Sequence, residues 1–138
     1  MRFEVVLKKE GAFWLIEAPA LDVMTQGRTR KEAYAMLKDA VELLVDRKDF
    51  AVALDILRRG AEVYLSANDR DQLIALMLRR QRQKYGLTLQ ELAKRLGAKS
   101  VNAFARYEQG KARPTVAKLL ELMAAIDPHL VPVLKLAA

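Results

Sequence analysis

Side chains suited to contacting nucleic-acid bases gather in one short segment of this 138-residue sequence, close to residue 100. A short helix is predicted there, with Phe104 and Tyr107 on its inner face and other side chains on its outer face. Arginine suits the edge of guanine, and asparagine the edge of adenine, in the major groove of DNA. We therefore predict base contacts from Ser100, Asn102, Ala103 and Arg106.

Cations flank this predicted helix, and another helix start precedes it. Phosphate groups are bound by Lys and Arg side chains and by the amide groups at helix N-termini. The predicted phosphate contacts are Lys99, Lys111 and Arg113, together with Thr88 and Gln90 at a helix start.

The net charge of +7 belongs to the second half of the chain. Residues 1–66 contain eleven Lys and Arg and eleven Asp and Glu, whereas residues 67–138 contain thirteen and six. This asymmetry favours a polyanionic partner for the basic half, because Lys and Arg neutralise phosphates. A solubilising surface is the alternative explanation of the same charge.

Four short helices must position these residues. Their predicted starts are Asn68, Thr88, Ser100 and the Pro114-Thr115 pair. Their first three predicted ends are Tyr85-Gly86, Gly97 and Gly110. The core faces of the second and fourth helices are predicted to be Leu89, Leu92, Ala93 and Leu96, then Val116, Leu119, Leu120 and Met123. Short helices with tight glycine turns are typical of a helix-turn-helix bundle, whose second helix of the pair enters the major groove.

The segment from Leu78 to Ile126, LRRQRQKYGLTLQELAKRLGAKSVNAFARYEQGKARPTVAKLLELMAAI, resembles the Cro and lambda-repressor-like (XRE) family. The resemblance implies a buried ion pair between Arg82 and Glu108, which we expect to fix geometry more than to add stability. Twelve residues separate Gly97 from Gly110, one more than is common in the family, and Gln81 replaces a usual apolar residue. The alternative to a DNA-binding domain is a helical module that binds only protein.

The hydrophobic pattern in the first half of the chain predicts a small sheet with one helix. A strand is predicted at residues 3–7, because apolar residues recur there at a spacing of two. A second is predicted at residues 13–17, which are rich in aromatic and branched side chains, and a third at residues 23–26, ended by Gly27. Thr29 and Glu32 match a capping box, so a helix should begin there, with an apolar stripe of Ala33, Met36, Leu37, Ala40, Val41 and Leu44. Residues 50–57 fit a strand or a helix, and we favour a strand that forms a hairpin with residues 62–66. The predicted fold class is α+β, a βββα-ββ domain over residues 1–66 and an all-α domain over residues 67–138.

The stretch EAPALDVMTQGRTRKEAYAMLKDAVELL is similar to the N-terminal domain of HicB-type antitoxins, a family with a partial ribonuclease H-like fold. The family motif is matched by Pro19, Thr25-Gln26-Gly27 and Glu32-Ala33, although Val23 and Met24 replace a usual glycine and cysteine. The resemblance implies a type II antitoxin that neutralises a HicA-like mRNA-cleaving toxin and represses its own operon. The candidate toxin contacts are Trp14, Asp22 and Met24. The alternative is a stand-alone helix-turn-helix regulator whose αβ domain senses a ligand or assembles oligomers.

Catalytic chemistry is not expected from this sequence. The carboxylates Glu4, Glu17 and Asp22 are not predicted to converge, as a two-metal nuclease site requires. There is no cysteine, the lone histidine is His129, and no glycine-rich phosphate loop or metal-ligand cluster appears. We expect neither an enzyme nor a cofactor.

The remaining predictions concern compartment and assembly. No apolar run approaches the ~20 residues that cross a bilayer, and no apolar leader precedes the first strand, so we expect a cytoplasmic protein. The apolar tail, residues 130–136, either covers a core in the single chain or pairs with a second subunit. We favour a homodimer, which a palindromic operator requires, and leave open whether dimers form tetramers.

Overall fold

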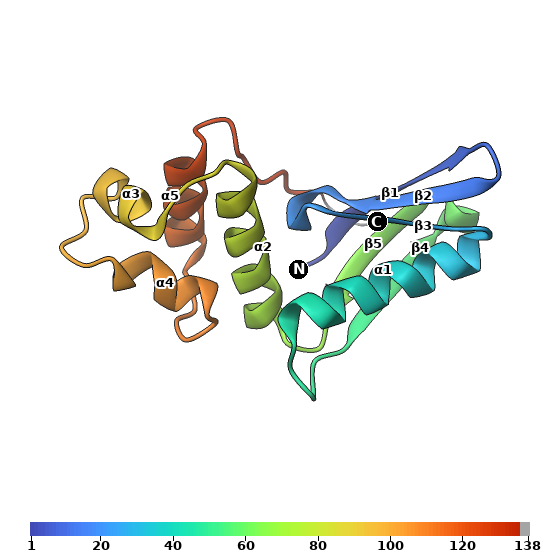
Figure 1. Ribbon diagram of the computed structural model, residues 1–138, viewed down its shortest axis with the longest axis horizontal. Coiled ribbons are helices and arrows are strands. Elements are labelled where there is room, and N and C mark those ends of the chain that lie inside the picture. Colours follow the sequence, from blue (N-terminus) through green and yellow to red (C-terminus); the bar gives the residue numbers. More distant parts are fainter. Residues whose placement is uncertain (136–138) are drawn as a thin grey trace. The chain divides into compact units, whose positions relative to one another are not determined.

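The computed structural model describes residues 1–135, in which a β-sheet with a long helix precedes a group of short helices (Figure 1). The chain divides into two compact units, unit 1 over residues 1–77 and unit 2 from residue 78 onward. The α+β class predicted from the sequence is confirmed. The predicted domain boundary at residues 66 and 67 lies at the end of the last strand.

Unit 1 is built on a five-stranded sheet in the order β3-β2-β1-β5-β4. The strands are β1 (Phe3–Glu10), β2 (Phe13–Ala18), β3 (Val23–Gly27), β4 (Val52–Leu57) and β5 (Glu62–Ala67). All neighbouring strands are antiparallel, and the first strand of the chain lies in the middle of the sheet. The segment that fitted either a strand or a helix is therefore strand β4, paired with β5 as predicted. Short 3-10 turns occupy Pro19–Leu21 and Arg58–Gly60.

One face of this sheet is covered by helix α1 (Arg30–Val45). The predicted helix start is confirmed, because Thr29 Oγ1 accepts a hydrogen bond from the Glu32 amide at 3.0 Å. Ala33, Leu37 and Val41 are fully buried against the sheet, in a line of residues four apart. Met36 was predicted on the same stripe but is 43% exposed, since it lies one position off that line.

Gly27 marks the point where β3 passes into α1. A Cβ atom on this glycine would lie 2.4 Å from the backbone nitrogen of Ala33, far closer than atoms can approach. The Thr-Gln-Gly and Glu-Ala parts of the motif noted in the sequence thus meet in space, and the glycine lets the helix dock on the strand.

The start of helix α2 (Arg70–Lys84) differs from the prediction by one residue. The carboxylate of Asp69, rather than Asn68, accepts hydrogen bonds from the first-turn amides of Asp71 and Gln72, each at 3.1 Å. Asn68 instead accepts from the Ala51 amide at 2.9 Å and donates to the Asp49 carbonyl at 2.7 Å. It ties the end of β5 to the segment before β4, partners that no local pattern reveals.

Unit 2 contains the end of α2 and three further helices, α3 (Leu89–Arg95), α4 (Asn102–Glu108) and α5 (Val116–Ile126). The core-facing side chains of α5 are Leu119, Leu122 and Ile126. The prediction that Val116 and Leu120 face the core was wrong, because they are 77% and 44% exposed. Leu119, Leu122 and Ile126 define a single line at helical spacing, and the other two residues lie outside it.

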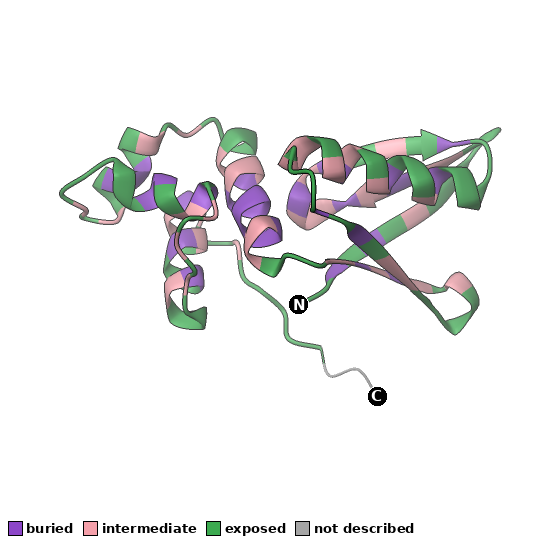
Figure 2. Ribbon diagram, turned by 90° about the horizontal axis from the view of Figure 1, so that it is seen from below, coloured by how far each residue is buried: buried purple, intermediate pink, exposed green. Residues whose placement is uncertain are grey.

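The apolar tail is exposed over residues 131–135, drawn in green in Figure 2, and it has no regular secondary structure there. It therefore covers no core within residues 1–135, and pairing with a second subunit remains a prediction; Leu136 lies outside the described residues. No helix within residues 1–135 is both long and apolar enough to span a membrane.

Candidate DNA-binding surface

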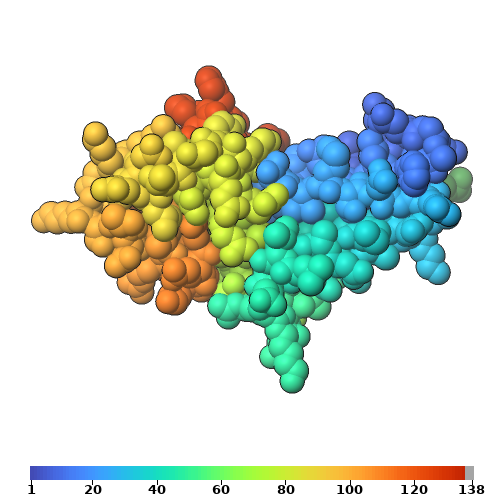
Figure 3. Space-filling model, in the orientation of Figure 1, coloured from blue at the N-terminus to red at the C-terminus, as the bar shows by residue number. Residues whose placement is uncertain are grey.

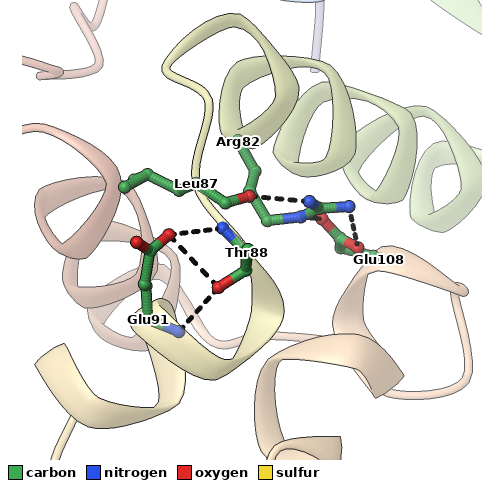
Figure 4. Close-up of polar contacts among 5 residues, drawn as sticks. All are labelled: Arg82, Leu87, Thr88, Glu91 and Glu108. Carbon is green, nitrogen blue, oxygen red and sulfur yellow. Dashed lines mark hydrogen bonds and ion pairs between the residues drawn. The ribbon is translucent and has the colours of Figure 1, made fainter.

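Helix α3 begins with a complete capping box. Thr88 Oγ1 accepts a hydrogen bond from the Glu91 amide at 3.1 Å, while the Glu91 carboxylate accepts from the Thr88 amide at 2.7 Å (Figure 4). The Thr88 amide and then its hydroxyl, which donates at 3.1 Å, hold the pKa of Glu91 below its usual value. The start of α3 is thus fixed by its own side chains.

A single guanidinium joins α2, the α2–α3 connection and α4. Arg82 donates from Nε to Glu108 Oε1 at 2.5 Å, from Nη2 to Glu108 Oε2 at 3.3 Å, and from Nη1 to the Leu87 carbonyl at 2.8 Å (Figure 4). The side chains of Arg82 and Glu108 are only 17% and 6% exposed. This bidentate geometry fixes direction as well as distance, so the pair sets where α4 lies relative to α2.

The contacts of α4 leave one of its faces open. Phe104, Ala105 and Glu108 are buried, while Tyr107 is half-buried. Asn102, Ala103 and Arg106, the predicted base contacts on this helix, are all exposed. Ala105 was not singled out in the sequence, because a small side chain gives little indication of burial.

The turn before α4 is organised by Ser100. Its Oγ accepts a hydrogen bond from the Asn102 amide at 3.2 Å, although the formal N-cap residue of α4 is Val101. Ser100 is exposed, and its hydroxyl hydrogen can still donate to another group. The connection between α3 and α4, light orange in Figure 3, projects from the surface of unit 2.

A shallow surface pocket brings several predicted contacts together. It lies between the start of α3 and the α3–α4 connection, and its lining includes Thr88, Gln90, Lys94, Lys99 and Ser100. The Thr88 hydroxyl is engaged with Glu91, whereas Gln90 and Lys99 are exposed. Lys94 is a further cation in this pocket that sequence reasoning did not select.

Two further predicted phosphate contacts follow α4. Lys111 and Arg113 are exposed on the segment between Gly110 and α5. Gly110 has a φ of +68°, a backbone angle that favours glycine and that turns the chain sharply here. The two cations therefore lie directly after the turn that ends α4, the helix with the predicted base contacts.

Several polar contacts hold the C-terminal end of α5 in unit 2. Arg95 donates to the carbonyls of Ala125 and Ile126 at 2.9 and 3.0 Å. The backbone amide of His129, then the Tyr85 hydroxyl, hold the pKa of Asp127 below its ordinary value, and the Tyr85 pKa is raised. The lone histidine thus contributes its backbone to a helix end, and its side chain is exposed.

Residues 78–127 match the helix-turn-helix family. No match was found among curated proteins for the chain. The family match agrees with the geometry of α3 and α4, so unit 2 is a helix-turn-helix domain of the XRE type, a class of domain that binds DNA in transcriptional regulators.

Proposed function

We propose that this chain is a HicB-like antitoxin that neutralises a HicA-like mRNA-cleaving toxin through unit 1 and represses its own operon through unit 2. The exposed face of α4, held in place by the Arg82–Glu108 pair, carries the DNA-binding part of the proposal. Unit 2 has twelve Lys and Arg against four Asp and Glu, a charge that attracts DNA phosphates.

The toxin-binding part is supported by the sheet face opposite α1. Alternation along the strands places Val6, Phe13, Met24 and Leu57 on this face, and they are 45%, 38%, 63% and 37% exposed. Exposed apolar side chains grouped in this way mark protein interaction sites. We call this surface the open face.

The charge of the open face suits a basic partner. The same alternation places on it the carboxylates of Glu4, Glu10, Glu17, Asp55 and Glu62 and the ammonium group of Lys8. Arg2 pairs with Asp55 at 3.0 Å and Arg58 with Glu62 at 2.9 Å. Glu4, Glu10 and Glu17 outnumber the one remaining cation, Lys8, so the face stays negative. An RNA-cleaving toxin must attract phosphates, so its surface is expected to be basic and to complement these carboxylates.

Of the three toxin contacts predicted from the sequence, Met24 belongs to the open face. Asp22 is half-buried in the turn before β3, and Trp14 lies on the side of the sheet that α1 covers. We therefore propose Met24 as a toxin contact together with Val6, Phe13 and Leu57.

The chain itself is proposed to do no chemistry. Within residues 1–135, no group of three or more His, Cys, Asp and Glu side chains is placed to hold a metal ion. In this proposal, neutralisation works by covering the active surface of the toxin, and dimers joined through the tail would bind a palindromic operator.

Co-purification tests the antitoxin proposal. The full chain is expressed with the tagged product of the adjacent small reading frame, and the complex is sized by chromatography with light scattering. We expect a stoichiometric complex and relief of the growth arrest that the partner causes. A harmless neighbour that does not co-purify would contradict the toxin part and favour a stand-alone regulator with an assembly or sensor domain.

A matched pair of methionine variants tests the open face. Met24→Lys should break the complex, because it places a cation against a basic partner and removes an apolar contact. Met36→Lys is the control, because Met36 is an exposed residue of α1 on the other side of the sheet, and this variant should leave the complex intact. Equal complex formation by both variants would contradict the assignment of this face.

A further inference from the structure

The ring of Trp14 is flanked by two cations from different elements. The Arg30 guanidinium carbon lies 4.5 Å from the ring centroid, and the Lys9 ammonium lies 5.7 Å from it. Within residues 1–135, neither cation is paired with a carboxylate. Stacking on an aromatic ring holds a guanidinium in place without using its N–H donors, so those of Arg30 remain available to a ligand.

The turn between β4 and β5 leaves room for Arg30. A Cβ atom on Gly60 would lie 2.9 Å from Arg30 Nη1, so the absence of a side chain there accommodates the guanidinium. The two preceding residues, Arg58 and Arg59, have φ angles of 48° and 58°, which arginine rarely adopts. Unfavourable backbone angles in non-glycine residues are a reason to look for a function of their side chains.

The topology gathers these cations at one end of unit 1. β1 ends there, β2 and α1 begin there, and β4 turns into β5 there, at the right-hand end of Figure 1. We define the basic edge as Lys9, Arg28, Arg30, Lys31, Arg58 and Arg59. The carboxylates near it are already engaged in part, since Glu62 pairs with Arg58 and Glu32 accepts from the Arg28 amide.

We infer that the basic edge is a second nucleic-acid contact, which binds the phosphate backbone through the stacked Arg30 and its neighbouring cations. Six of the eleven Lys and Arg side chains of residues 1–66 lie on this edge, and they outnumber the nearby carboxylates of Glu10, Glu32 and Glu62. A preorganised guanidinium with open donors suits phosphate oxygens, and a group of cations along one edge can follow successive phosphates. The inference is independent of the toxin, because a basic protein would be repelled from this edge.

Fluorescence anisotropy on the full chain tests this contact. The probes are a single-stranded RNA oligonucleotide, a duplex DNA without operator sequence, and polyglutamate, each over a range of salt. Lys9→Gln/Arg30→Gln should bind the RNA about tenfold more weakly at low salt, with a salt slope reduced by about 1.4. Arg47→Gln/Lys48→Gln removes the same charge from the loop after α1 and should bind like the wild type.

The comparison of probes and variants decides the result. Circular dichroism of each variant shows whether unit 1 has kept its fold, and Arg30→Lys, which keeps the charge, should restore part of the affinity. A Lys111→Gln variant in unit 2 should weaken the duplex more than the RNA. The inference is overturned if the edge variant binds RNA and duplex as tightly as the wild type, or if polyglutamate shows the same loss.

Discussion

Arg82 and Glu108 meet through two hydrogen bonds, at 2.5 and 3.3 Å, although twenty-six positions separate them in the sequence. Arg82 also donates to the Leu87 carbonyl, so one side chain holds both the connection between α2 and α3 and the end of α4. The position of the exposed face of α4 therefore depends on a partly buried ion pair.

Removal of one member of this pair should destabilise unit 2 strongly. Glu108→Ala is expected to lower the free energy of unfolding by about 3 kcal/mol, because Arg82 is left without its counter-charge. Arg82→Met/Glu108→Leu should lose only about 1 kcal/mol, since no charge is then left unpaired. Urea unfolding followed by far-UV circular dichroism measures both. A loss in Glu108→Ala as small as that in Lys118→Ala, which breaks the surface pair with Glu121, would contradict the structural role.

Substitutions on and after α4 should separate specific from general DNA binding. Arg106→Ala is expected to cost about 1–3 kcal/mol of operator binding while random DNA is bound almost as before. Lys111→Ala should weaken binding to all sequences and reduce the salt slope by about one unit. Titrations of operator and random duplexes at several salt concentrations distinguish the two. Equal losses on both duplexes for Arg106→Ala would show that α4 does not read bases.

The capping box of α3 should give unit 2 an acid-sensitive component of stability. The folded-state pKa of Glu91 is lowered from its ordinary value of 4.5, chiefly by the Thr88 amide. Its stabilising effect is therefore fully present above that value and is lost as the pH falls through the folded-state pKa. Glu91→Gln should flatten the dependence of Tm on pH in the acid range. Glu121→Gln on α5 is the control, and a Glu91→Gln curve parallel to the wild type would refute the prediction.

Gly27 should tolerate no side chain. Gly27→Ala is expected to lower the free energy of unfolding by about 1–3 kcal/mol, because the added methyl group meets the backbone of α1 and forces it away from β3. Gly11 has open space around it and a φ of +59°, so Gly11→Asn should be almost neutral. Thermal unfolding of the two variants gives the comparison, and a stable Gly27→Ala protein would mean that β3 and α1 can separate at little cost.

Local patterns in the sequence predicted much of this structure. Thr29 with Glu32 predicted a helix start, because these partners lie three residues apart, and Thr88 was predicted as a cap; its partner Glu91 was not singled out. The strands were found for a similar reason, since alternation is a property of neighbouring residues. Arg82 and Glu108 came from a family resemblance, which supplied a distant contact that no spacing in the chain reveals.

Other features depend on contacts between distant residues. Asn68 was predicted as a helix cap, but its partners are seventeen and nineteen positions away, at Ala51 and Asp49. The exposure of Val116 and Leu120 depends on how α5 turns toward its neighbours, which helical spacing alone leaves open. The stack of Lys9, Trp14 and Arg30 joins three elements, so no local pattern of residues indicates it.

The central place of β1 in the sheet has a consequence for synthesis of the chain. β1 pairs with β2 at once, but its other edge waits for β5, which emerges from the ribosome only after α1 and β4. During that interval a central strand has a free edge that can pair with other chains. Unit 1 therefore completes its folding late, through the pairing of Phe3 with Leu65, whereas the Arg82–Glu108 and Arg95–Ile126 contacts of unit 2 span only twenty-six and thirty-one positions.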